Sequence, residues 1–183
     1  MTVANEIRPL RRIVVRDNRD GTRSGALCDA PSPDVHTDPA RPGFAATRMW
    51  VTDRTPARIQ NETLNTPHAI EPPKAGSLCR YLQIPPDAAW KGKVGAKEVQ
   101  AYFMSMGSPT ASSYCSTAPH PYMQKTRTLD FALIIEGDIT LVLDLEEVNL
   151  SAGDTVVLRG ANHAWSNRSD KPCLIAMSMH DAM

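Results

Sequence analysis

The sequence predicts an all-β fold, a barrel or sandwich of short strands. From Tyr122 onward turn signals recur about every ten residues, with short apolar runs between them. Proline (15 residues) outnumbers glycine (10 residues), which favours turns and extended connections over long helices. A chain of 183 residues is long enough for one well-packed core, so we expect a single domain.

The N-terminal half is predicted to hold three strands and one helix. The β-branched run Arg12 to Arg16 indicates a first strand, ending at the turn 17–21 and followed by a long extended arm broken by prolines. Further strands are expected at 47–52 and 78–84, with a proline-rich surface loop between them. Apolar residues at helical spacing predict a helix over 96–106, which Gly107 ends.

The C-terminal half is predicted to be a meander of strands at 131–135, 139–143, 155–158 and 174–177. The turns between them are expected at 136–138, 144–147, 151–154, 159–162 and 167–172. Successive short strands of this kind are typical of a closed barrel or a double-sheet fold.

Charge and cysteine content narrow the class of protein. Lys plus Arg (20) equals Asp plus Glu (20), so no basic excess favours nucleic acid or an anionic membrane surface. The four cysteines form no C-x-x-C pair, and reduced thiols in a cytoplasmic protein are the simplest interpretation. The N-terminus has no apolar signal-peptide region, and no apolar run is long enough to cross a bilayer.

The segment from Tyr122 to Asp181 resembles a cupin, a double-sheet jelly-roll barrel, and is similar to single-domain cupins of natural-product biosynthesis clusters. Gln124-Lys-Thr126 stands where the first cupin motif has H-x-H, Asp130 replaces its glutamate, and Gly137 follows after six residues. The second motif is better kept, with Gly153-Asp154 leading to His163-Ala-Trp165-Ser-Asn167. The resemblance implies a barrel core at 118–183, with 1–117 as an N-terminal extension whose strands and helix pack on it within one domain.

The candidate catalytic residues are Gln124, Thr126, Asp130 and His163. Side chains alternate along a strand, so Gln124 and Thr126 share a face, and cross-strand pairing could bring Asp130 and His163 to the same interior face. Trp165, Tyr122, Arg159 and Met123 are the candidate substrate-binding residues. For His163 the competing interpretation is a structural histidine bonded to a backbone carbonyl, and for Arg159 it is a surface salt bridge.

No metal cofactor is predicted, because a cupin ion is held by imidazoles and a carboxylate, and only one of each remains here. If a divalent ion binds weakly, Gln124, Asp130 and His163 would hold it. The remaining histidines carry little signal. His120 is expected in an exposed loop, His36, His68 and His180 show no informative spacing, and Asn162 and Asn167 are interpreted as turn residues.

The interior residues predict acid–base chemistry, as in a lyase, dehydratase or cyclase, including a pericyclic cyclase. The resemblance implies an enzyme of secondary metabolism that acts on a polyketide-like or terpenoid-like small molecule. One alternative is a metal-dependent cupin oxygenase or isomerase. The other is a cupin that binds a small molecule without turning it over. A homodimer is expected, formed through the β-rich N-terminal segment, because such a strand cannot bury itself alone.

Overall fold

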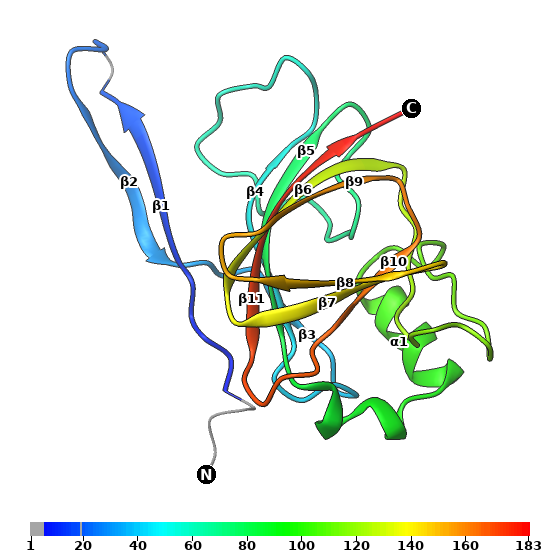
Figure 1. Cartoon of the computed structure of the whole chain (residues 1–183). Coiled ribbons are helices and arrows are strands. Elements are labelled where there is room, and N and C mark those ends of the chain that lie inside the picture. Colours follow the sequence, from blue (N-terminus) through cyan, green and yellow to red (C-terminus); the bar gives the residue numbers. More distant parts are fainter. Residues whose placement is uncertain (1–5, 19) are drawn as a thin grey trace.

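The computed structural model describes residues 6–18 and 20–183, and its strands form three antiparallel sheets (Figure 1). The strands are β1 (Arg11–Asp17), β2 (Ser24–Pro31), β3 (Val35–Thr37), β4 (Ala45–Thr52), β5 (Ser77–Ile84), β6 (Thr128–Glu136), β7 (Asp138–Leu143), β8 (Glu147–Ser151), β9 (Thr155–Arg159), β10 (His163–Ser166) and β11 (Cys173–Asp181). Two short 3-10 helices, η1 (Asp87–Ala89) and η2 (Lys91–Lys93), precede helix α1 (Ala96–Ser105).

The barrel consists of a six-stranded sheet and a three-stranded sheet. The larger sheet has the order β3-β4-β5-β11-β6-β9, and the smaller has the order β10-β7-β8. The smaller sheet crosses in front of the larger one, and buried side chains from both sheets form one core (Figure 1). The larger sheet takes β3, β4 and β5 from the N-terminal half of the chain and β11, β6 and β9 from the C-terminal half. The predicted all-β double-sheet fold is confirmed.

Strand β6 shows why the fold follows from the sequence. Its side chains alternate strictly, with Asp130, Ala132 and Ile134 buried while Phe131 and Leu133 on the other face are about two-fifths exposed. The turn into β7 requires Gly137, whose φ is +80°. A Cβ atom at Gly137 would also lie 3.0 Å from the carbonyl oxygen of Pro172. The motif glycine therefore allows the chain to pass from β6 in the larger sheet to β7 in the smaller one.

Helix α1 lies where helical spacing predicts it and covers one end of the barrel (Figure 1). It buries Val99, Tyr102 and Phe103 in the core, and Glu98 accepts a hydrogen bond from the Gly95 N–H at its start. Gly107 ends the helix with a φ of +68°, in a position where a Cβ would lie 2.0 Å from the His68 carbonyl oxygen.

The N-terminal strand is not followed by an extended arm, and this part of the prediction is wrong. After β1 the chain reverses direction, and β2 pairs with β1 along its full length as an antiparallel hairpin that projects from the barrel (Figure 1). The turn forms because the side chains of Asn18 and Asp20 accept hydrogen bonds from the backbone N–H of Thr22. The first proline after β1 is Pro31, the last residue of β2, so the proline-rich segment begins where the hairpin ends.

The proline-rich stretch between β4 and β5 is largely exposed, as predicted, but it is fixed to the sheet. Ile70 and Thr63 are buried, and Arg48 of β4 donates hydrogen bonds to the carbonyls of Thr66 (2.8 Å) and Pro67 (3.0 Å). Within the described residues, no helix is long and apolar enough to span a membrane.

Candidate active site in the barrel interior

Gln124 and His163 meet at the centre of the candidate site. Their backbones form an isolated antiparallel bridge, in which each N–H donates to the other's carbonyl at 2.8 and 2.9 Å. The His163 Nδ1 lies 2.9 Å from the Ala161 carbonyl oxygen, which can only accept, so Nδ1 carries the proton. The His163 Nε2 is therefore the basic nitrogen, and it faces the Gln124 amide nitrogen at 3.3 Å. Burial lowers the pKa of His163, which favours the neutral imidazole.

Asp130 supplies a buried carboxyl on the inner face of β6. It is 1% exposed, and its Oδ1 has no hydrogen-bond partner among the described residues. Burial raises the pKa of Asp130, although the Thr128 hydroxyl and the charge of Arg80 act in the opposite direction. Thr126 is buried two residues earlier, and its hydroxyl lies 2.7 Å from that of Thr128. The interior thus contains a neutral imidazole and a carboxyl that holds its proton to higher pH than usual.

Arg80 is a residue of the site that the sequence analysis missed. It lies on β5 in phase with the buried Leu78 and Leu82, and it is itself 2% exposed. Its Nε has no partner among the described residues, and its charge acts on both Asp130 and His163. An arginine in phase with inward-facing leucines was the signal that could have revealed it.

A small internal cavity lies next to Arg80 and Gln124. Its volume is about 20 Å³, room for about one water molecule. It is lined by Arg41, Phe44, Arg80, Leu82, Ile84, Tyr102, Tyr122, Gln124, Ala164 and Trp165.

The barrel interior is polar and closely filled, and it is not an apolar cavity. The Arg41 guanidinium lies 3.5 Å from the ring centre of Tyr122 and 3.9 Å from that of Phe44. Arg41 also donates to Asp38 at 2.7 Å, and the Tyr122 hydroxyl donates to the same carboxylate at 2.8 Å. Arg41 follows β3 in a proline-rich segment without periodicity, so no pattern in the sequence indicated that it points inward.

The predicted substrate-binding residues lie in three different places. Trp165 and Tyr122 line the internal cavity, and the Trp165 ring lies 5.9 Å from that of His163. Met123 is fully buried in a separate small cluster with Val142 and Ala164. Arg159 is exposed and lines an open pocket of about 700 Å³, and Thr126 contributes to the wall of the same pocket. A pocket of that size is in the range of small-molecule sites.

His120 is not an exposed loop residue as predicted, and this prediction is wrong. It is 1% exposed and packs edge-on against Trp90, while its Nδ1 accepts from the Tyr122 N–H at 3.2 Å. Its Nε2 lies 3.7 Å from Asp87. The loop that carries His120 folds over η1, which buries the ring. Asn167 likewise does more than close a turn, because its amide also donates to the distant Ile84 carbonyl at 2.9 Å.

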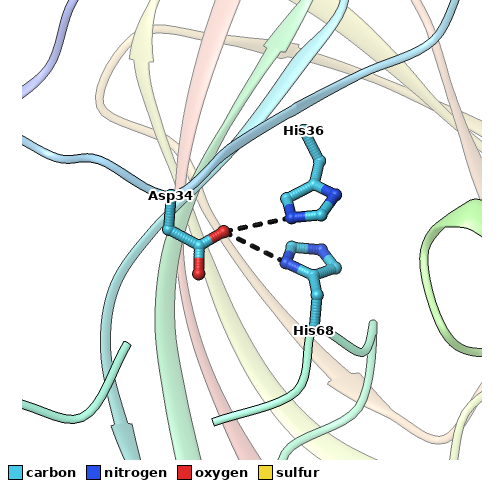
Figure 2. Close-up of side chains that lie close together, drawn as sticks. All are labelled: Asp34, His36 and His68. Atoms are coloured by element: carbon cyan, nitrogen blue, oxygen red, sulfur yellow. Dashed lines mark hydrogen bonds and ion pairs between the residues drawn. The ribbon is translucent and has the colours of Figure 1, made fainter. Parts of the chain in front are cut away.

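Two of the three histidines without a spacing signal, His36 and His68, come together at the edge strand of the larger sheet, whereas His180 lies on β11. His36 and His68 stack with ring centres 3.5 Å apart, and both contact the Oδ1 of Asp34, at 3.2 and 3.3 Å (Figure 2). Their ligand atoms lie within 4.8 Å of one another, as a metal site would require. However, Arg48 already pairs with the other oxygen of Asp34, so the carboxylate charge is neutralised within the protein. We interpret this cluster as a structural contact between β3 and the proline-rich loop.

The three residues predicted to hold a weakly bound ion do not fit a tightly bound transition metal. Gln124, Asp130 and His163 offer one imidazole, one carboxyl with a raised pKa, and one neutral amide. The positive charge of Arg80 also acts on both titratable members of the set. No chemical step is therefore assigned to a metal here.

The two facing sheets, the glycine turn at Gly137 and the buried His163 form a small double-sheet barrel, as the resemblance to cupins implies. No family model matches the chain. Over 48 residues, 26% of the chain, it is 46% identical to the phomopsin biosynthesis cluster protein C' of Diaporthe leptostromiformis. Over 50 residues, 27% of the chain, it is 42% identical to the oryzines biosynthesis cluster protein J of Aspergillus oryzae. The matched stretches span about a quarter of these curated relatives, 25% and 28% of their lengths.

Among solved structures, the fold is similar to a Cupin 2 conserved barrel domain protein from Salinispora arenicola. The two chains are 16% identical with a TM-score of 0.39, and the similarity covers 76% of this chain and 77% of the other.

Proposed function

We propose that this protein is an enzyme of secondary metabolism that uses acid–base chemistry to dehydrate or cyclise a small oxygenated molecule. The main observation behind this proposal is that the barrel interior contains two titratable groups, and the environment of each favours its neutral form. His163 presents an unprotonated Nε2, and Asp130 presents a carboxyl with a raised pKa. A base and an acid placed in one interior are what proton removal and hydroxyl departure require. The similarity to biosynthesis cluster proteins supports the metabolic setting.

In this proposal His163 Nε2 removes a proton next to an activating carbonyl or phenol. Asp130, through Thr128 and Thr126 or a water, gives a proton to the departing hydroxyl. The Gln124 amide, whose nitrogen lies 3.3 Å from Nε2, hydrogen-bonds the oxyanion that develops on the substrate. In a cyclisation the same base and acid act on two positions of one molecule.

The closed interior sets a condition on this mechanism. Its free volume is about 20 Å³, so a substrate group enters beside Gln124 only when Arg41 and its stacked rings move aside. The open pocket of about 700 Å³, with Thr126 and Arg159 in its walls, is a separate space large enough for a small molecule.

A non-catalytic binding cupin is the main alternative, and gene replacement in the native host distinguishes the two. Deleting the gene should remove a late metabolite and accumulate a precursor that differs from it by one water, or that has the same composition in a cyclisation. Wild-type protein should restore the metabolite, while His163→Ala and Asp130→Asn should not. Restoration of the metabolite by both variants would contradict the proposal.

The proposal includes assembly as a homodimer through the β1–β2 hairpin. The hairpin projects from the barrel, and Ile13 and Val15 of β1 are 51% and 71% exposed (Figure 1). An isolated two-stranded hairpin is marginally stable in water, and pairing with a second copy would cover these side chains.

A further inference from the structure

The small internal cavity is surrounded by buried hydrogen-bond donors that have no partner. The Nε of Arg80, the Nε1 of Trp165 and the Nη2 of Arg41 are each buried without a hydrogen bond among the described residues. All three residues line this one cavity. Buried polar groups in folded proteins almost always have partners, and an unmade bond costs free energy. Three unused donors around one space indicate that an acceptor belongs there.

Of these three residues, Arg80 is the one that most needs an acceptor, because its guanidinium is buried without an ion pair in the described part of the chain. It is 2% exposed, and no described residue accepts a hydrogen bond or forms an ion pair with it. Asp130 influences its charge but forms no ion pair within 4.0 Å. A buried guanidinium left in this state is unfavourable unless an anion joins it.

Arg48 provides an internal comparison, because it lies directly opposite Arg80 on the neighbouring strand β4. The Arg48 guanidinium donates to Asp34, and to the carbonyls of Thr66 and Pro67 at 2.8 and 3.0 Å. The fold thus satisfies one buried arginine of this pair fully and leaves the other open toward the cavity. The difference indicates that the Arg80 guanidinium is kept for a ligand.

We propose that this cavity binds a carboxylate group of the substrate, with Arg80 as its anchor and Trp165 Nε1 as a second donor. The planar guanidinium matches a carboxylate in a two-bond arrangement, which favours this anion over a neutral carbonyl. The free space of about 20 Å³ admits a carboxylate only when Arg41 and its stacked rings move aside, and Arg41 adds positive charge on the adjoining wall. The inference rests on the proposed function, and it specifies the substrate class as a carboxylic acid.

Binding of a carboxylate at Arg80 would also change the basicity of His163. The charge of Arg80 opposes protonation of both His163 and Asp130. A carboxylate on Arg80 would offset that charge, so His163 would become a stronger base once the substrate is bound.

The test uses acetate as the probe and acetamide as its neutral analogue of the same shape. With the purified wild-type protein at constant ionic strength, acetate should raise the melting temperature in a saturable way, and acetamide should not. Arg80→Met should lose the acetate effect, while Arg168→Met, which removes an exposed arginine, should keep it. Equal shifts with acetate and acetamide, or a full acetate shift in Arg80→Met, would overturn the proposal.

A second measurement covers the case in which Arg80→Met does not fold. In wild-type protein labelled with ¹⁵N-arginine, acetate should move one Nε–H signal progressively and acetamide should leave it in place. Trp165→Phe, which removes one donor but keeps an aromatic ring, should weaken acetate binding several-fold. The absence of any acetate-dependent arginine signal would contradict the site.

If acetate binds through Arg80 while His163→Ala still restores the metabolite in the host, the carboxylate site stands and the acid–base function fails.

Discussion

Gln124 and His163 are joined twice, by reciprocal backbone hydrogen bonds and by a side-chain contact of 3.3 Å between Gln124 Nε2 and His163 Nε2. The Ala161 carbonyl fixes the proton on Nδ1, so the Gln124 amide can donate to Nε2, the nitrogen that takes up a proton in the proposed reaction. The contact favours the tautomer in which Nε2 is unprotonated, and a neutral amide rather than a second imidazole faces this nitrogen.

This relationship predicts weak metal binding and a simple way to strengthen it. The purified wild-type protein should retain well under one equivalent of Fe, Mn, Ni, Cu or Zn after dialysis against a chelator. Gln124→His should raise the affinity for Zn²⁺ by about tenfold or more, because a second imidazole is a far stronger donor than an amide. Titration calorimetry checks both values. Unchanged affinity in Gln124→His would mean that residue 124 does not face Asp130 and His163.

Catalytic variants should separate the roles of the interior residues. With the precursor that accumulates in the gene-deletion host as substrate, His163→Ala should lower kcat by about 10² to 10⁴-fold, the usual contribution of a positioned base. Thr126→Val and Gln124→Ala should cost less, because they assist rather than transfer the proton. Circular dichroism should show an intact fold in each variant. Near wild-type turnover in His163→Ala together with loss in Asp130→Asn would assign the base to Asp130 instead.

The sequence predicts the barrel well because its strands obey a simple alternation. In β6 the buried Asp130, Ala132 and Ile134 follow the two-residue period, and Gly137 marks the turn that the backbone requires. The same two-residue period predicts that Gln124 and Thr126 share a face, and both side chains are buried. These features are local, so they can be read from a few neighbouring residues.

The parts that the sequence does not predict depend on contacts between distant segments. Arg41 reaches the interior through its stacking on Tyr122, 81 positions later in the chain. His68 meets His36 only because the proline-rich loop folds over the edge strand (Figure 2). The unsatisfied state of Arg80 becomes visible only when every neighbour is placed, although its inward phase on β5 was a signal.

The stacked histidines predict a dependence of stability on pH. Burial, and next the charge of His36, lower the pKa of His68 to about 4, below the ordinary value of 6.5. Between these values the unfolded chain binds a proton that the folded chain does not, so the free energy of unfolding falls as the pH falls from 6.5 to about 4. Urea unfolding at a series of pH values should show a shallower fall in His68→Asn than in wild type. His36→Asn should also reduce the slope, and identical slopes in all three proteins would contradict this assignment.

The hairpin should govern assembly rather than the barrel fold. Ile13 and Val15 are exposed on β1, whereas the neighbouring Arg12 is 6% exposed and binds Glu62 through two hydrogen bonds of 2.9 and 2.6 Å. Arg12 thus fixes the hairpin to the proline-rich loop while the apolar side chains stay free for a second copy.

We expect a homodimer in sedimentation at micromolar concentration, and a monomer after deletion of residues 1 to 17. The double variant Ile13→Asp with Val15→Asp should give the same monomer with an intact hairpin, because paired strands bring the new charges of the two copies together. The exposed Leu145, which lies between β7 and β8, offers a matched control, since Leu145→Asp should leave the mass unchanged. A wild-type monomer, or a dimer that survives the deletion, would remove the hairpin from the assembly.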